Sequence, residues 1–303
     1  MTIPSQTVDF VIIGAAKAGT TSLASWLGSH PDVCMSNPKE TMFFASSKLF
    51  DHGLDYYHYQ FYAHYCSETL IGEATPAYSN RDRHPGTAER LFKANPEAKI
   101  IYMVRHPLRK AESSWQMHVN LTPDLATTPE EELCGIRARE GFDCYMSEPS
   151  IFENLAKTCS YNYQLQPWLE RYSEERVHVM YLEDLAANRT KELARLCTFL
   201  AIDPQPLLAS PLSVENSLSK RRVHRRFVGF LAKTRFQRLF PTSARRAWAR
   251  SSLFAIPQTN LLQPIWPDHL FVKFTKAVKS DVQKFLLNHG KCIDFYSFHQ
   301  AKN

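Results

Sequence analysis

Residues 9–29 read DFVIIGAAKAGTTSLASWLGS, and this stretch decides the fold class. Four of its first five residues are apolar, and the run ends at Gly14, a pattern typical of a buried parallel strand. Residues 20–29 place Leu23, Trp26 and Leu27 on one face at helical spacing, so they predict a helix. A buried strand that leads through a short loop into a helix indicates an α/β protein.

The loop between this strand and this helix has the composition of a phosphate-binding loop. Small residues let the backbone curl around an anion, and the N–H groups at a helix start bind phosphate. Lys17 adds a positive charge, and Thr20 and Thr21 add hydroxyl donors. The loop differs from a Walker A motif, because Thr20 stands where that motif has its lysine. The pattern favours a phosphate site over the alternative, a plain junction with a surface lysine.

Strands and helices alternate along the rest of the chain. We expect strands at residues 33–35, 70–73, 99–104 and 176–181, and helices at 86–94, 107–119, 151–172, 191–200 and 268–288. This alternation predicts a three-layer α/β fold, a parallel sheet with helices on both faces. Residues 121–149 are rich in Pro, Thr and Glu without strong periodicity, so we expect a long variable loop there. With no obvious linker, residues 1–303 are expected to form one domain.

The composition is that of an ordinary globular protein. The 303 residues are 44 % hydrophobic and 22 % charged, which excludes disordered, collagen-like and coiled-coil classes. No apolar run approaches the ~20 residues of a membrane span, and the first residues lack the pattern of a secretory signal. Seven scattered cysteines without a C-x-x-C pair argue against a disulfide framework or a zinc site. We therefore expect a cytoplasmic protein that needs no metal.

The net charge of +6 comes from one segment. Residues 219–250 contain eleven Lys or Arg and no Asp or Glu, and the rest of the chain has 25 basic and 30 acidic residues. The segment could bind an anionic ligand or act as a lid, or it could be a solvated basic face or an amphipathic helix that packs on the core.

Five motifs in chain order carry a family resemblance. They are Gly14–Leu23 with His30-Pro31, Lys39-Glu-Thr-Met-Phe-Phe44, Glu73-Ala-Thr-Pro-Ala-Tyr78, Arg105 followed by Ser113, and Tyr181-Leu-Glu-Asp-Leu185. Over residues 10–202 the chain resembles the sulfotransferases that use 3′-phosphoadenosine 5′-phosphosulfate (PAPS). It looks most similar to the branch of the heparan sulfate 3-O- and N-sulfotransferases. The resemblance implies the P-loop nucleotide-kinase-like sulfotransferase fold.

The resemblance also implies a set of donor-binding residues. The first motif would hold the 5′-phosphate and the sulfonate with Lys17, Ala18, Gly19, Thr20, Thr21 and Ser22. Arg105 would bind the 3′-phosphate through two donors, and Ser113 would add a hydroxyl. A late loop that closes over the nucleotide has as its candidates Lys220, Arg221 and Arg222.

Three residues are candidates for catalysis. Glu40 matches the glutamate that acts as the general base of the family, the alternative being a solvated loop carboxylate. Lys17 would stabilise the charge that develops on the phosphate as the sulfonate leaves. His118 is a second candidate base, the alternative being a partly buried structural histidine. The family branch has a lysine where this chain has Ala74, which leaves open a smaller acceptor or another cation at that place.

The motifs together predict a sulfotransferase. It would move the sulfonate of PAPS to a hydroxyl or an amine of a small-molecule, metabolite or carbohydrate acceptor, and release 3′-phosphoadenosine 5′-phosphate (PAP). No nucleic-acid partner is expected. One alternative is an ATP-dependent small-molecule kinase, against which stands the missing Gly-Lys-Ser/Thr. The other is a catalytically inactive module that binds a polyanion through residues 219–250.

Overall fold

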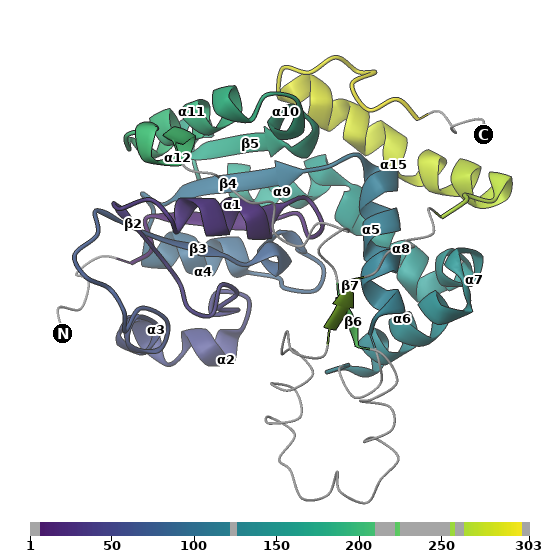
Figure 1. Cartoon of the computed structure of the whole chain (residues 1–303), viewed down its shortest axis with the longest axis horizontal. Helices are drawn as coiled ribbons and strands as arrows, with labels where there is room; N and C mark the ends of the chain where they lie inside the picture. Colours follow the sequence, from purple (N-terminus) through teal and green to yellow (C-terminus); the bar gives the residue numbers. More distant parts are fainter. Residues whose placement is uncertain (1–6, 122–125, 210–221, 225–254, 258–263, 299–303) are drawn as a thin grey trace, which may run out of the picture.

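A five-stranded parallel sheet forms the centre of the computed structural model, which describes residues 7–121, 126–209, 222–224, 255–257 and 264–298 (Figure 1). The strands are β1 (Phe10–Gly14), β2 (Val33–Met35), β3 (Leu70–Ala74), β4 (Lys99–Val104) and β5 (Val177–Tyr181). Their order is β2-β3-β1-β4-β5, and every pairing is parallel. The five predicted strands are confirmed, each within one residue at either end.

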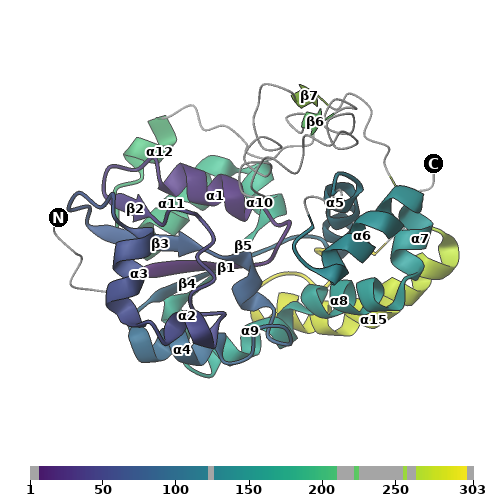
Figure 2. The same cartoon turned by 90° about the horizontal axis from the view of Figure 1, so that it is seen from below.

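Helices cover both faces of this sheet. Figure 2 shows α1 (Thr20–Leu27), α10 (Leu182–Ala187), α11 (Arg189–Leu200) and α12 (Gln205–Ala209) on one face. The other face carries α3 (Gly53–Phe61), α4 (Thr87–Ala94) and α9 (Tyr161–Leu169). All five residues of β1 and five of the six of β4 are buried, as expected of central strands covered on both sides. The predicted three-layer α/β architecture is confirmed.

A further group of helices lies beyond the carboxyl end of β4. It contains α5 (Pro107–Val119), α6 (Pro129–Glu140), α7 (Phe142–Ser147), α8 (Pro149–Cys159) and the long α15 (Asp268–Asn288) (Figure 1). Helix α15 packs on α8, where the ring of Phe274 lies 5.8 Å from that of Phe152. The predicted bounds of α15 are confirmed.

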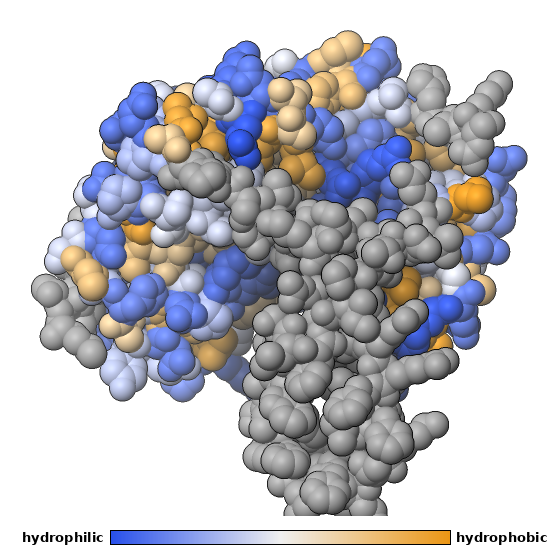
Figure 3. All heavy atoms as spheres, in the orientation of Figure 1, coloured by the Kyte–Doolittle hydropathy of each residue, from blue (hydrophilic) through white to orange (hydrophobic). Residues whose placement is uncertain are grey.

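Short elements complete the described chain. They are α2 (Ser47–Phe50), the 3₁₀ turns η1 (Pro76–Ser79) and η2 (Glu174–Arg176), and the antiparallel strands β6 (Arg222–His224) and β7 (Ala255–Pro257). Within the described ranges, no helix has the length and apolar character needed to cross a bilayer. On the face shown in Figure 3, hydrophilic residues prevail among those described, and hydrophobic ones form small separate groups. The organisation as one domain stays a prediction.

The loop prediction for residues 121–149 is wrong, because α6 and α7 occupy most of this segment. The start of α6 is set by Thr128, whose side chain accepts a hydrogen bond from the N–H of Glu131, and by Pro129 in the first turn. Only Gly135 and Ala138 of α6 are buried, so the helix has no apolar stripe. Its signal therefore lies in its cap and not in hydrophobic periodicity.

The helix predicted over residues 151–172 is also wrong in part. The segment forms two helices, α8 and α9, separated at Ser160, whose φ of −80° and ψ of 77° are not helical. The buried residues have helical spacing within each helix, which accounts for the helical prediction, but they shift to another face between Cys159 and Tyr161, where the break lies.

Candidate active site

The loop that follows β1 is shaped by two glycines. Gly14 has a φ of +142°, and a Cβ there would lie 2.3 Å from Ser79 Oγ and 2.9 Å from the carbonyl oxygen of Pro76. Gly19 has a φ of +90°, and a Cβ there would lie 2.9 Å from Leu182 Cδ1. Gly14 therefore requires glycine for conformation and for space, whereas Gly19 requires it for conformation, because the leucine methyl can move.

Hydrogen bonds hold the loop in a tight turn between these glycines. The N–H of Ala15 donates to the carbonyl of Met103 on β4, and the N–H of Ala18 donates to the carbonyl of Ala15 at 3.2 Å. Lys17 has a left-handed φ of 68°. The side chains of the loop and of the first turn of α1 alternate between half-buried and buried. Half-buried are Lys17, Gly19 and Thr21, and buried are Ala18, Thr20 and Ser22.

Arg105 joins this loop to the end of β4. Its Nη1 donates to the carbonyl oxygen of Lys17 at 3.2 Å, although the two residues are 88 positions apart in the chain. Burial lowers the pKa of Arg105, against a smaller opposite effect of Glu183. Ser113 lies buried two turns into α5. The structure thus brings the loop and Arg105 together at the carboxyl edge of the sheet, where ligands of open α/β sheets bind.

The motif of residues 181–185, at the end of β5, supports the backbone that follows Arg105 in the chain. Glu183 accepts a hydrogen bond from the N–H of His106 at 2.9 Å and another from the hydroxyl of Tyr296 at 3.2 Å. Asp184 pairs with Lys291 at 2.5 Å. This motif therefore ties the start of α5 to the segment after α15.

Glu40 lies on the loop between β2 and α2, close to the first turn of α1. Its side chain is 50 % exposed, and its Oε1 lies 2.9 Å from the Nζ of Lys39. The same Nζ donates to Thr21 Oγ1 at 3.4 Å. One lysine therefore connects the candidate base with the candidate sulfonate-binding threonine. The sequence motif contains Lys39 but gives it no role, because its contact with Thr21 depends on the fold.

The motif at residues 73–78 holds this loop in place. The N–H of Thr41 donates to Thr75 Oγ1 at 3.1 Å, and the N–H of Phe44 donates to the hydroxyl of Tyr78 at 3.1 Å. Phe43 and Phe44 are fully buried and their rings meet edge to face at 5.0 Å. The two phenylalanines anchor the loop in the core, so that Glu40 stays near the surface.

Glu73 is a functional candidate that the sequence did not single out. It is fully buried at the end of β3, where its Oε2 accepts hydrogen bonds from Thr41 Oγ1 at 2.5 Å and from the hydroxyl of Tyr57 at 3.0 Å. Burial raises the pKa of Glu73 to about 7, and the hydrogen bonds from Thr41, Tyr78 and Tyr57 oppose this rise. Next to it, Ala74 is fully buried and its N–H donates to the carbonyl of Lys39 at 3.3 Å.

His118 lies in the last turn of α5. Its Nδ1 is 2.8 Å from the hydroxyl of Tyr145. Burial, and to a smaller extent the charge of Lys17, lower the pKa of His118 to about 4. An imidazole with this pKa is uncharged at neutral pH and is a weak general base there.

The structure describes only one of the three residues expected to close over the nucleotide. Lys220 and Arg221 lie outside the described residues, and Arg222 is described by its backbone, which pairs with Pro257 between β6 and β7. Within the part of the chain that the structure covers, no group of three or more His, Cys, Asp or Glu side chains could hold a metal ion.

The comparison with protein families identifies the class to which this chain belongs. Residues 7–226, more than half of the chain, match the family model described as "Sulfotransferase domain". The chain therefore belongs to the sulfotransferase family, and the family predicted from the motifs is confirmed.

Two relatives and one solved structure illustrate how similar the chain is to known members. "Heparan sulfate glucosamine 3-O-sulfotransferase 5" of Homo sapiens is 26 % identical over 200 residues, which are 64 % of this chain and 54 % of that protein. "Membrane-associated sulfotransferase kil1" of Dictyostelium discoideum is 35 % identical over 113 residues, which are 37 % of this chain and 23 % of that protein. A sulfotransferase from Alicyclobacillus acidocaldarius has a TM-score of 0.60 at 20 % identity and covers 96 % of this chain and 98 % of its own. The predicted sulfotransferase fold is confirmed.

Proposed function

We propose that this protein transfers the sulfonate of PAPS to a hydroxyl or an amine of a small-molecule, metabolite or carbohydrate acceptor. The observation that carries the proposal is the contact chain from Thr21 through Lys39 to Glu40, because it brings a carboxylate next to a phosphate-type loop. A carboxylate so placed can take a proton from an acceptor that approaches the donor.

The loop and Arg105 would bind the two ends of the donor. The N–H groups at the start of α1, with Thr20, Thr21 and Lys17, suit the 5′-phosphosulfate. The guanidinium of Arg105, with Ser113, suits the 3′-phosphate, because a planar guanidinium can donate two parallel hydrogen bonds to a phosphate.

Glu40 would act as the general base of an in-line displacement. A bond forms between the acceptor oxygen or nitrogen and sulfur, and the bond between sulfur and the 5′-phosphate oxygen breaks. The electron pair goes to the phosphate, which leaves as part of PAP, and Glu40 takes the acceptor proton. Lys17 would stabilise the negative charge that grows on the leaving phosphate. A carbohydrate acceptor is supported by the human relative, whose name gives heparan sulfate glucosamine as its acceptor.

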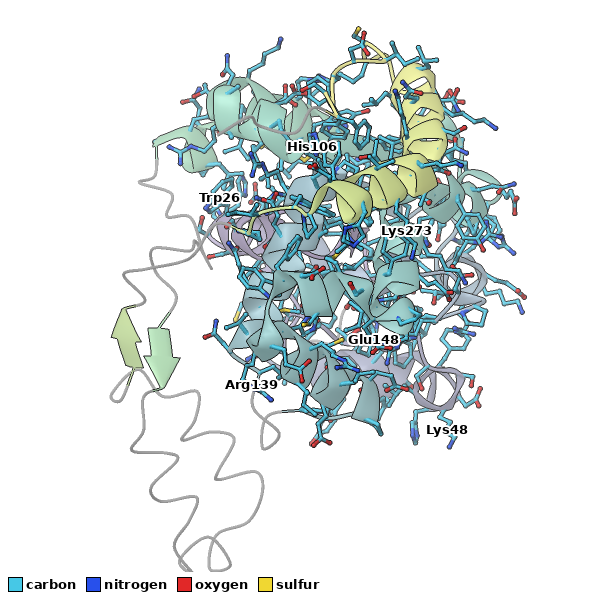
Figure 4. The ribbon with its side chains drawn as sticks, turned by 90° about the vertical axis from the view of Figure 1, so that its right-hand side faces the viewer. Trp26, Lys48, His106, Arg139, Glu148 and Lys273 are labelled. Carbon is cyan, nitrogen blue, oxygen red and sulfur yellow. The ribbon has the colours of Figure 1, made fainter. Side chains whose placement is uncertain are left out.

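The proposal is tested by calorimetric titration of PAP and of ATP into the wild-type protein, Arg105→Ala and Arg139→Ala. Arg139 is the matched control, an exposed arginine on α6 (Figure 4). We expect the wild type and Arg139→Ala to bind PAP at least tenfold more tightly than ATP. Loss of charge-assisted hydrogen bonds in Arg105→Ala should weaken PAP binding by about 10- to 100-fold.

Two results would overturn the proposal. Equal binding of PAP and ATP would favour the kinase alternative. Binding of neither nucleotide, with salt-sensitive binding of a polyanion such as heparin, would favour the polyanion-binding alternative. The cytoplasmic location stays a prediction.

A further inference from the structure

Lys39 is held in a defined position although it lies on a loop. Its carbonyl oxygen accepts hydrogen bonds from Ser36 Oγ at 3.0 Å and from the N–H of Ala74 at 3.3 Å. Its side chain is only 25 % exposed. The backbone of Lys39 is therefore anchored to the edge of the sheet, and its ammonium group points to the first turn of α1.

The ammonium group of Lys39 lies between a hydroxyl and a carboxylate that the proposed reaction uses. Nζ is 3.4 Å from Thr21 Oγ1 and 2.9 Å from Glu40 Oε1. An ion pair with this exposure, between neighbouring residues, adds little to stability. The contact with Thr21 brings the same ammonium group to the first turn of α1, beside the place proposed for the sulfonate.

We propose that Lys39 is a donor-binding and catalytic residue, whose ammonium group contacts the oxygens of the transferring sulfonate beside Thr21. This inference rests on the proposed function. Ala74, the neighbour of Lys39 across the hydrogen bond to β3, carries no charge, so the positive charge on this side of the sulfonate comes from Lys39. Lys17, which belongs to the loop itself, would stabilise the leaving phosphate.

The same contact couples donor binding to the base. While Lys39 pairs with Glu40, one carboxylate oxygen is occupied by an ammonium group. Once the sulfonate binds, it competes for this ammonium group, and the Glu40 oxygen becomes available to the proton of the acceptor. In the transfer the acceptor–sulfur bond forms, the sulfur–phosphate oxygen bond breaks, the proton goes to Glu40, and Lys39 keeps all its protons. Donor binding thus prepares the base.

The test compares two nucleotides that differ by the sulfonate. Calorimetry measures the binding of PAPS and of PAP to the wild type, Lys39→Met, Lys39→Arg and the control Lys48→Met. Lys48 is an exposed lysine on α2, and Figure 4 shows it on the opposite side of the ribbon from Trp26 of α1. We expect Lys39→Met to weaken PAPS binding at least tenfold and PAP binding by less than twofold. Lys39→Arg should recover part of the PAPS affinity, and Lys48→Met should match the wild type.

The outcomes separate this inference from the proposed function. If the wild type binds neither PAP nor PAPS, the proposed function fails and this inference fails with it. If the wild type binds both, and Lys39→Met changes both affinities by the same factor or changes neither, only this inference is overturned. Melting temperatures of all variants are measured, and Lys39→Gln replaces Lys39→Met if that variant does not fold.

Discussion

The buried carboxyl of Glu73 should make the free energy of unfolding depend on pH, and the substitution Glu73→Gln should remove this dependence. Glu73 has no exposed surface and has a pKa of about 7, compared with 4.5 for an ordinary glutamate. Between these two pH values the folded protein keeps a proton that the unfolded chain releases. The free energy of unfolding therefore falls as the pH rises through this range, and stays lowered above pH 7.

The size of this effect follows from the difference between the two pKa values. Each pKa unit corresponds to 1.36 kcal/mol, so about 2.5 units correspond to about 3 kcal/mol. Glu73→Gln cannot ionise and removes this contribution. The free energy of unfolding of the wild type, relative to Glu73→Gln, should therefore fall by about 3 kcal/mol between pH 4.5 and pH 8.

Urea unfolding followed by circular dichroism at pH 4.5 and pH 8 measures this difference. The matched control is Glu153→Gln, an exposed glutamate on α8, whose difference from the wild type should change little with pH. A difference between the wild type and Glu73→Gln that varies by less than about 1 kcal/mol between the two pH values would refute the reasoning. It would mean that the carboxyl of Glu73 is charged in the folded protein at neutral pH.

Three further predictions concern the base, the loop and the core. Glu40→Gln should lower kcat about 10²- to 10⁴-fold and leave the affinity for PAP within twofold of the wild type. If Glu40→Gln keeps more than a tenth of the wild-type turnover, Glu40 is not the base. Gly14→Ala should lower the free energy of unfolding by at least about 2 kcal/mol more than Gly141→Ala, whose φ of +138° is close to the +142° of Gly14 and whose added Cβ meets nothing within 4 Å. Urea unfolding measures this, and equal effects would contradict the steric argument. Phe274→Ala should lower the free energy of unfolding, measured in the same way, by about 3–5 kcal/mol. Val272→Ala, whose residue is 62 % exposed, should lower it by less than about 1 kcal/mol. Similar losses in the two variants would contradict the assigned core.

The central strands and the last helix could be predicted from the sequence because burial dictates their residues. Residues 10–14 and 100–104 are buried and read as apolar runs. Helix α15 buries one stripe that includes Phe274, Val278 and Val282 at helical spacing. Helix α6 could not be predicted in this way, because it lies at the surface and buries only two small residues.

The parts of the candidate site that the sequence missed arise from contacts between distant segments. Lys39 meets Thr21 across 18 residues, and Arg105 meets Lys17 across 88. The raised pKa of Glu73 results from its burial beside Tyr57, Thr41 and Tyr78, which come from three other segments. A motif gives the identity of such residues, but only the fold gives their neighbours.

The position of β1 in the sheet separates the two halves of the proposed reaction. The donor would be bound by residues that follow the neighbouring strands β1 and β4. Glu40 lies on the connection after β2, which forms one edge of the sheet and is separated from β1 by β3. The two halves nevertheless meet at one contact, because Lys39 of this connection reaches Thr21 of the donor loop. Exchange of residues 36–46 with the equivalent loop of another family member would therefore alter the donor site as well, unless Lys39, Glu40 and the buried Phe43 and Phe44 are kept.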